Sequence, residues 1–200
     1  VSKETRKFVT VALNGDGGDE SFAGYERYHA MIIAARLENM PSQVKYLLRG
    51  FSGIFPDSIE PKSKLRRLRR FLEGAFLPGY ARYAKWVSIF DDTFKKRLYT
   101  EDFINRFSSG DSLESIKRFF DNHNSDNILD TLLNVDVHTY LPYDLLVKVD
   151  IASMSNSLEA RSPFLDHKLM EFAARLPCKY KLKTGIKKYI LKKTIKDLVP

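Results

Sequence analysis

The stretch from residue 9 to residue 20 constrains the fold and the function of this chain more than any other. Residues 8–13 are Phe, Val, Thr, Val, Ala and Leu, a pattern that predicts a short interior strand. Residues 14–20 read Asn-Gly-Asp-Gly-Gly-Asp-Glu, which predicts a glycine-rich turn carrying carboxylates and then a helix. Glycines let backbone amides approach a ligand closely, and open α/β sheets bind ligands where their strands end. The stretch therefore predicts a binding site at the end of a strand.

Several common ligand-binding loops do not fit this turn. No Gly-Lys-Ser/Thr follows it, its glycines lack the Gly-x-Gly-x-x-Gly spacing, and the oxygen ligands of an EF-hand are incomplete. Taken alone, the turn is also compatible with a structural role, in which a glycine-rich connection carries carboxylates that only cap the helix.

Helical spacing of apolar residues predicts that most of the remaining chain is α-helical. A lone buried strand leaves its backbone groups without partners, so we expect the neighbouring strands to come from a segment upstream in a longer α/β protein. A loop is predicted over residues 51–62 and a turn over residues 161–166, where Asp166 would cap the next helix. The predicted helices are residues 20–38, 42–51, 64–72, 80–90, 111–123, 126–140, 143–154, 166–175 and 187–198, with short helices within 91–107.

Composition bounds the class of protein and its partners. Two hundred residues suffice for one domain, or for one domain with an appendage. The 33 Lys and Arg outnumber the 25 Asp and Glu, and the net charge of +8 favours anionic partners. The sequence contains no apolar run of about 18 residues, so no membrane-spanning helix is predicted. The one cysteine, Cys178, suits a reducing compartment and is expected to be a small residue filling a buried or half-buried position. The four histidines have no spacing typical of metal ligands.

A second block of chemistry-bearing residues occupies positions 140–166. Lys148 follows Asp144 by four residues, which would place both on one face of a helix. Glu159 and Arg161 are expected to flank a turn. Without the glycine-rich turn, this block would be read as a packed helix pair held by ion pairs.

Together the two blocks resemble the synthetase domain of glutamine-dependent asparagine synthetases. Residues 14–25 are similar to the family's Ser-Gly-Asp/Glu-Gly-Gly/Ser-Asp-Glu-Leu-Phe-Gly-Gly-Tyr, with Asn14, Ser21 and Ala23 as departures. Residues 141–166 match Leu-Pro-Asp-Asp-Leu-Leu-x-Lys-x-Asp and then Ser-Leu-Glu-Ala-Arg-x-Pro-Phe-Leu-Asp, with Tyr143 as the departure. Residues 184–191 resemble the closing Lys-x-Ile/Leu-Leu motif, with Lys188 in register. The resemblance extends from about residue 9 to the C-terminus and is weakest over residues 41–125.

The resemblance implies an α/β fold, here a fragment of an adenine-nucleotide alpha-hydrolase-like (PP-loop ATP pyrophosphatase) domain. This fragment would be mostly helical, with one short parallel-type strand near the N-terminus. Residues 1–200 would be the C-terminal part of the synthetase domain. The family uses ATP and Mg²⁺ to convert the side-chain carboxylate of aspartate to an acyl-adenylate, and ammonia from glutamine then displaces AMP. A cytoplasmic location is expected.

The resemblance also implies a role for each residue of the turn. Asn14 and Gly15 would contact the nucleotide, and Gly17 and Gly18 would help the chain to pass close beneath it.

The charged residues would carry the chemistry in this reading. Asp16 would lie beside the adenylate carbon and govern formation of the intermediate, Asp19 would bind Mg²⁺, and Lys188 would neutralise phosphate charge. Glu159 and Arg161 would order the wall of the site.

Two features of the family are absent from these residues. The glutaminase half needs an N-terminal Cys nucleophile, and the synthetase half needs a first pyrophosphate-binding loop, Ser-Gly-Gly-x-Asp-Ser; neither occurs here. We therefore expect the 200 residues alone to be inactive. Their expected partner is an N-terminal glutaminase domain of the same longer chain, and homodimer formation is left open.

Two alternatives remain. One is a sister amidotransferase that amidates another carboxylate, such as a sugar acid of a polysaccharide. The other is a non-catalytic or RNA-binding relative, favoured by the basic run at residues 62–70. That run is also expected as a solvated helix face with Leu65 and Leu68 buried, and it lacks the aromatic residues typical of RNA binding. Apart from Lys188, the lysines between residues 179 and 196 are likewise read as a solvated face.

Overall fold

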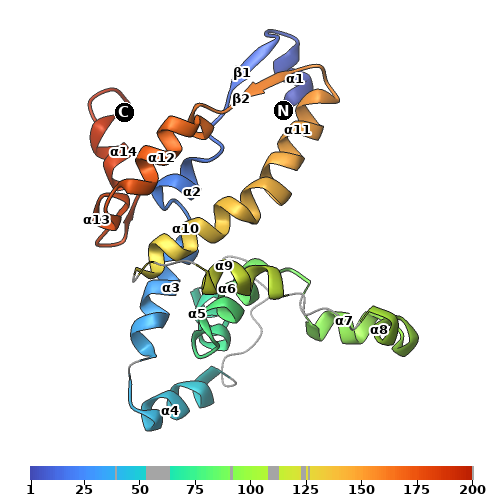
Figure 1. Ribbon diagram of the computed structural model, residues 1–200, viewed down its shortest axis with the longest axis vertical. Coiled ribbons are helices and arrows are strands. Elements are labelled where there is room, and N and C mark those ends of the chain that lie inside the picture. Colours follow the sequence, from blue (N-terminus) through green and yellow to red (C-terminus); the bar gives the residue numbers. More distant parts are fainter. Residues whose placement is uncertain are drawn as a thin grey trace. The chain divides into compact units, whose positions relative to one another are not determined.

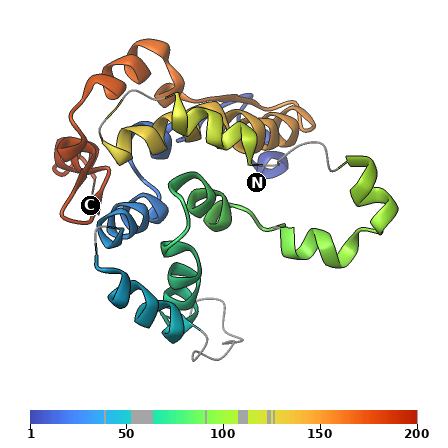
Figure 2. The ribbon, with the colours of Figure 1, turned by 60° about the horizontal axis from the view of Figure 1, so that its bottom comes forward.

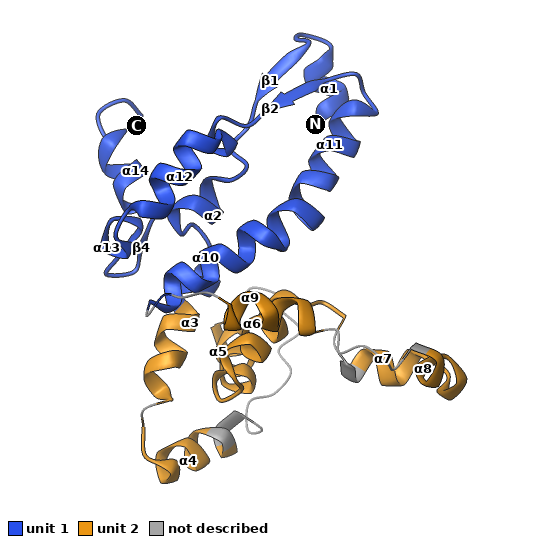
Figure 3. Cartoon of the chain, in the orientation of Figure 1, with its two compact units in different colours: residues 1–29, 123–200 blue, residues 30–122 orange. Residues whose placement is uncertain are grey.

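The computed structural model describes residues 1–38, 40–52, 64–90, 92–107, 113–122, 125 and 127–199. The chain forms two compact units, which Figure 3 colours separately. Unit 1 contains residues 1–29 and 123–200, and unit 2 contains residues 30–122. Both are mainly helical, as the periodicity predicts. The loop predicted over residues 51–62 lies mostly outside the described residues.

Unit 1 contains a short parallel strand pair. Strand β1 (Val11–Leu13) pairs with β2 (Glu159–Arg161), with Val11 opposite Glu159 and Leu13 opposite Arg161. The backbone amide of Asn14 continues the ladder by donating to the carbonyl of Arg161 at 2.9 Å. The prediction that every neighbour of the strand lies outside the chain was therefore wrong, because β2 is a neighbour. Three residues reading Glu-Ala-Arg carry no apolar alternation, so only the pairing reveals this strand.

Helix α2 (Gly18–Phe22) is the packing centre of unit 1. It contacts α10 (Ile128–His138), α12 (His167–Arg175), α14 (Tyr189–Thr194) and the 3₁₀ turn η2 (Pro163–Leu165), as Figure 1 shows. Phe22 is buried and meets Phe164 edge to face at a ring separation of 6.0 Å. These contacts hold the strand-to-helix turn against the C-terminal part of the chain.

The helix predicted over residues 20–38 is divided into two helices. After α2 the chain breaks at Ala23 and Gly24 and resumes as α3 (Glu26–Leu37). Ala23 has a positive φ of 57°, which ends the helix in the left-handed region. Apolar spacing runs through the break, so periodicity alone predicts one helix.

The middle of unit 1 contains a π-helical turn. α10 begins at the Asn127 cap, whose side chain accepts from the amide of Leu129 at 2.9 Å. The chain then forms η1 (Leu141–Leu146), a π-helix that leads into α11 (Val147–Met154). A π turn widens the helical repeat, so the four-residue spacing of Asp144 and Lys148 no longer aligns them. The two form no ion pair in the described part of the chain.

The ends of unit 1 add shorter elements. The N-terminal α1 (Ser2–Arg6) contacts α11. The predicted cap at Asp166 is confirmed, since its carboxylate accepts from the amides of Lys168 at 3.0 Å and Leu169 at 3.1 Å.

A hairpin replaces the start of the last predicted helix. After α13 (Cys178–Lys181), strands β3 (Leu182–Lys183) and β4 (Ile186–Lys187) pair antiparallel. Thr184 and Gly185 form the turn, and both have positive φ, as is typical of two-residue hairpin turns. α14 therefore begins at Tyr189 rather than at the predicted residue 187.

Unit 2 is built from paired helices. It holds most of α3 together with α4 (Ser42–Ser52), α5 (Lys64–Ala75), α6 (Gly79–Val87), α7 (Asp92–Leu98), α8 (Glu101–Phe107) and α9 (Glu114–Asp121). α4 packs on α5, α5 on α6 and α6 on α9, and Figure 2 allows these pairs to be followed. Phe71 stacks on Trp86 at 5.5 Å, and Tyr83 tilts against Phe120 at 5.9 Å.

The basic helix α5 buries a different set of residues from the one expected. Leu72 and Ala75 are buried, whereas Leu65 and Leu68 are 47% and 43% exposed. The prediction that Leu65 and Leu68 are core residues was therefore wrong. None of the described helices in either unit is both long enough and apolar enough to cross a membrane.

Candidate functional site

The turn after β1 is held by the side chain of Asn14. Its amide nitrogen donates to Asp16 Oδ2 at 2.8 Å, and the backbone amide of Asp16 donates back to Asn14 Oδ1 at 3.3 Å. The hydroxyl of Ser162, next to β2, also donates to Asn14 Oδ1. These bonds fix the direction of the half-buried Asp16 carboxylate. Ser162 was missed at the sequence level, because no local pattern connects it to Asn14.

The glycines of the turn serve different purposes. Gly17 has a φ of +85°, and a Cβ there would lie 2.3 Å from Leu165 Cδ2, so both its backbone and its packing require glycine. A Cβ at Gly18 would lie 3.3 Å from the ring of Phe164. Above Gly15 a Cβ would meet no atom within 4 Å. Open space therefore adjoins Gly15, while Gly17 and Gly18 are packed against η2.

Asp19 and Lys188 lie far apart in the sequence and meet in the structure. Lys188 Nζ lies 3.0 Å from Asp19 Oδ1, and both side chains are about one-third exposed. Lys188 is the cap residue before α14 and has a φ of 52°, so its backbone is in the left-handed region. This pair brings together two of the predicted site residues, one from each end of the chain.

Gly24 is a site residue that the sequence-based prediction missed. A Cβ at Gly24 would lie 1.6 Å from Asp19 Oδ1 and 2.4 Å from Lys188 Cε. Any larger residue would push the two charged side chains out of place. Its position one residue before Tyr25, within the matched motif, was the available signal.

A second carboxylate of α2 is buried. Glu20 accepts a hydrogen bond from the hydroxyl of Tyr25 at 2.5 Å. Burial raises the pKa of Glu20 above its usual value, and the bond from Tyr25 works against this rise. Burial, together with the adjacent Glu20 carboxylate, raises the pKa of Tyr25 as well. The three charged residues of the turn and α2 therefore divide into an accessible pair, Asp16 and Asp19, and a buried Glu20 bonded to Tyr25.

Arg27 lies among tyrosine rings next to the hydrogen-bonded Glu20 and Tyr25. Its guanidinium lies 3.7 Å from the ring centre of Tyr25 and 4.7 Å from that of Tyr140. It also forms an ion pair of 2.7 Å with Asp136, a fully buried residue that accepts a hydrogen bond from the hydroxyl of Tyr28. This network fixes the start of α3 against α10.

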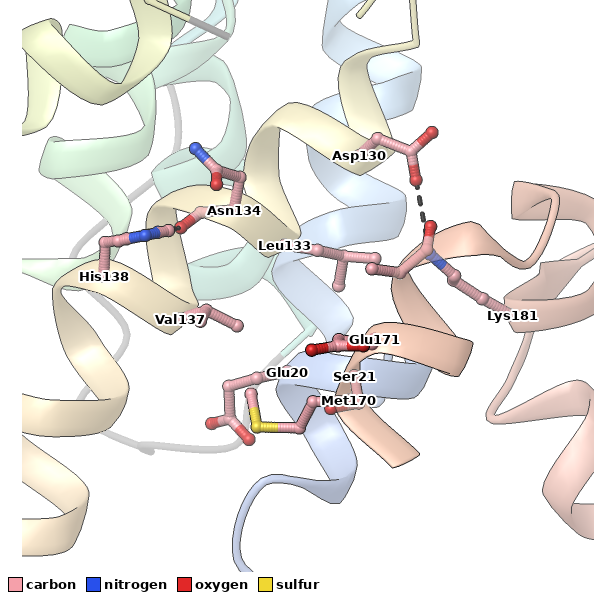
Figure 4. Close-up of a pocket in the computed structure, with 11 residues that line it drawn as sticks. Glu20, Ser21, Asp130, Leu133, Asn134, Val137, His138, Met170, Glu171 and Lys181 are labelled. Atoms are coloured by element: carbon pink, nitrogen blue, oxygen red, sulfur yellow. Dashed lines mark hydrogen bonds and ion pairs between the residues drawn. The ribbon is translucent and has the colours of Figure 1, made fainter. Parts of the chain in front are cut away.

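A cavity of about 310 Å³ lies on the side of α2 that faces α10 and α12 (Figure 4). Leu133, Val137 and Met170 form much of its apolar wall. Three carboxylates, from Glu20, Asp130 and Glu171, line it with one ammonium, from Lys181. Lys181 is buried and lies 3.3 Å from Asp130. The excess of carboxylates makes this cavity unsuited to phosphate.

Cys178 behaves as the sequence predicts. It is half-buried, and burial together with a hydrogen bond to Asp130 raises its pKa to about 12. At neutral pH the thiol is protonated, so a nucleophilic role is not supported.

The donor set at Asp19 is compatible with one contact to magnesium. The described residues contain no group of three or more His, Cys, Asp or Glu that could hold a metal ion. Mg²⁺ commonly keeps several waters and binds one or two carboxylates plus substrate phosphates. Asp19 therefore fits as one protein ligand of an ion held mainly by a nucleotide.

Glu159 and Arg161 form the strand that faces β1. Arg161 Nε lies 2.6 Å from Glu159 Oε1, and both side chains are exposed. Their backbone pairs with β1, so the prediction that they flank a turn was wrong, because pairing with β1 holds residues 159–161 as a strand.

The structure is a mainly helical protein in which a glycine-rich, carboxylate-bearing loop follows a strand of a short parallel pair. A family model, asparagine synthase, matches residues 1–200. The chain belongs to the asparagine synthase family.

Individual relatives agree with this assignment. Asparagine synthetase [glutamine-hydrolyzing] 1 of Bacillus subtilis is 34% identical over 201 residues, covering 100% of this chain and 30% of the relative. A Mycobacterium tuberculosis (strain H37Rv) protein with a provisional glutamine-hydrolysing asparagine synthetase name is 30% identical and is covered over 29% of its length. Amidase chry2 of Gibberella zeae is 24% identical over 96% of this chain and 30% of the relative. The chain thus spans about 30% of the length of these relatives. No solved structure matches it.

Proposed function

We propose that this chain is the C-terminal part of the synthetase domain of a glutamine-dependent asparagine synthetase and forms one wall of its ATP site. The contact that carries this proposal is the Lys188–Asp19 pair at 3.0 Å, beside the turn that fixes Asp16. A cation, two accessible carboxylates and an open backbone position at Gly15 are what an adenylating site requires. Such an enzyme would work in asparagine biosynthesis, and we expect it in the cytoplasm.

In the proposed reaction, an oxygen of the aspartate side-chain carboxylate attacks the α-phosphorus of ATP and pyrophosphate leaves. Ammonia then attacks the acyl carbon and AMP leaves. Lys188 stabilises the charge that builds on the phosphates, since it is aimed at the turn by its contact with Asp19. Asp16, held by Asn14, orients the reacting carbon and assists loss of a proton from the incoming ammonium.

Asp19 is the residue proposed to hold Mg²⁺. The ion, when bound with the nucleotide, supplies charge neutralisation at the leaving pyrophosphate. In its absence Asp19 is paired with Lys188, so the carboxylate keeps a counter-charge in both states.

The rest of the site is proposed to lie in an upstream segment. The two-stranded β1–β2 pair leaves Leu13 74% exposed and Val11 38% exposed, although a parallel sheet is normally covered. Further strands of a PP-loop ATP pyrophosphatase domain would cover them and would bring the first pyrophosphate loop. An N-terminal glutaminase domain would supply the ammonia. The 200 residues alone are accordingly proposed to be inactive.

The test uses the longer protein that carries this chain. Asp16→Ala and Lys188→Met should each lower aspartate-dependent ATP–pyrophosphate exchange by about 10²–10⁴-fold, while glutamine hydrolysis stays intact. The matched control is Lys192→Met, which removes an exposed lysine of α14. Undiminished exchange in both variants would refute the proposal, and loss of both activities would indicate a misfolded variant.

A second acceptor is favoured by one comparison. The similarity to a protein named amidase chry2 indicates that this scaffold also occurs in proteins with other names. Exchange measured with aspartate and with a panel of sugar acids distinguishes the two acceptors. Salt-dependent RNA binding without exchange on any acid would instead support the non-catalytic alternative.

A further inference from the structure

A basic pocket lies in the C-terminal part of unit 1, and its lining contains none of the predicted site residues. It has a volume of about 360 Å³ and is bounded by α13, β3 and α14, the elements at the C-terminal end in Figure 1. Lys179, Lys183 and Lys193 line it together with Tyr180, Tyr189 and Ile190. A volume of this size is within the range of sites that take small molecules.

The lysines of this segment fall into two groups. Lys181, Lys187 and Lys188 each have a carboxylate partner, in Asp130, Glu26 and Asp19 respectively. In the described part of the chain, the three lysines that line the basic pocket have none. The lining contains no acidic side chain. The uncompensated ammonium groups are therefore gathered at the pocket, rather than spread over the segment.

Two of these ammonium groups lie over the rings of tyrosine residues that also line the pocket. Lys183 Nζ lies 4.8 Å from the ring centre of Tyr189 and 3.4 Å from its hydroxyl. Lys179 Nζ lies 5.4 Å from the ring centre of Tyr180. A cation–π contact holds an ammonium in place without neutralising it, so each lysine keeps its full attraction for an anion.

We infer that this pocket binds a small phosphorylated molecule. Three ammonium groups in one concavity repel each other, and a ligand with two or more negative charges relieves that repulsion. Lysine ammonium groups are common phosphate ligands, because each is a compact charge with three donors. Tyr180 and Ile190 supply apolar surface for the remainder of the ligand. The three lysines are exposed, as the prediction of a solvated face expects, and the inference adds that this part of the face binds a ligand.

The test measures binding of fructose 1,6-bisphosphate to the longer protein by titration calorimetry at 0.15 M salt. This probe carries two phosphates and is neither an adenine nucleotide nor pyrophosphate, so it does not report on the proposed ATP site. Lys179→Gln, Lys183→Gln and Lys193→Gln combined should weaken binding by at least about tenfold. The matched control combines Lys168→Gln, Lys192→Gln and Lys196→Gln, which removes the same charge from exposed positions.

A second pair of variants keeps the inference falsifiable if the triple variant unfolds. Tyr180→Glu places a carboxylate among the lysines and should also abolish binding, whereas Tyr180→Phe keeps the ring and should retain it. The inference is overturned if the wild type does not bind the probe, or if both triple variants lose the same affinity. The inference is also overturned if the Lys179, Lys183 and Lys193 triple variant still binds fructose 1,6-bisphosphate but no longer binds RNA or anionic vesicles.

Discussion

Units 1 and 2 are of similar helical character but differ in what their charged residues do. In unit 1, the Asp19–Lys188 and Arg27–Asp136 ion pairs join parts of the chain that are distant in the sequence. In unit 2, described pairs such as Lys117 with Asp121 are one helical turn apart and exposed, and the buried Arg82, which pairs with the distant Glu38, is an exception. Every predicted site residue falls in unit 1.

The two units also differ in the causes that shift the pKa values of their ionisable side chains. Burial raises the pKa of Glu20, Tyr25 and Cys178 in unit 1. In unit 2 a hydrogen bond to Asp121 raises the pKa of the exposed Lys117. Charges that are desolvated act on their neighbours strongly, whereas exposed pairs are screened by solvent and salt. These three pKa shifts caused by burial therefore lie in unit 1, the unit that also holds the predicted site residues.

Removing a buried carboxylate of unit 1 should produce the largest effect. Asp136→Ala removes the buried carboxylate that lies 2.7 Å from the Arg27 guanidinium and should destabilise unit 1 by about 3–5 kcal/mol. The control in unit 2 is Asp102→Ala, which breaks an exposed pair with Arg106 and should cost about 0.5 kcal/mol or less. Denaturant unfolding followed by hydrogen exchange in each unit measures both values. Equal costs would remove the contrast between the units.

The second-largest difference between the units is expected when a glycine of each is replaced by alanine, which adds one methyl group. Gly24→Ala places a Cβ against Asp19 and Lys188 and should destabilise the protein by about 1–3 kcal/mol with loss of exchange activity. Gly50→Ala in α4 meets nothing within 4 Å and should stabilise its helix by about 0.5–1 kcal/mol. Thermal unfolding measures both changes. Tolerance of Ala at residue 24 would contradict the close packing described for the Asp19–Lys188 pair.

The pH dependence of stability should reveal the buried Glu20. Since its pKa is raised on folding from the usual 4.5, its contribution to stability is full below that pH and is lost as the pH rises through the folded-state pKa. Glu20→Gln should flatten this decline. Tyr25→Phe should steepen it, because the Tyr25 bond lowers the pKa of Glu20. Unfolding free energies measured from pH 4 to pH 8 test the pair, and identical profiles would exclude a perturbed Glu20.

The last comparison concerns cysteine reactivity, and its variants should change the stability of the protein least. With a pKa of about 12, Cys178 is about one ten-thousandth thiolate at pH 8 and should react slowly with iodoacetamide. Asp130→Asn should speed the reaction, because Asp130 helps to raise that pKa. Ser115→Cys, an exposed position of unit 2, combined with Cys178→Ser should react far faster than the wild type. Comparable rates would contradict the burial of Cys178.

Most helices and the glycine-rich turn could be predicted from the sequence. The tertiary contacts that surround the turn could not. Asp166 predicts a helix start because capping is local, and the structure has that cap. The break after α2 depends on Gly24 lying against Asp19 and Lys188, a tertiary contact that periodicity does not encode. β2 exists only through its pairing with β1, and Ser162 reaches Asn14 only because of that pairing. Family motifs placed Lys188 in the site, whereas spacing alone could not.

The left-handed backbone at Lys188 sets a limit on engineering this protein. A non-glycine residue at a φ of 52° costs about 1–2 kcal/mol, which glycine would not incur. A thermostabilising library would therefore enrich Lys188→Gly, and the enriched clones would lack the cation that meets Asp19. Selection for heat resistance and selection for turnover are expected to choose opposite residues at this one position.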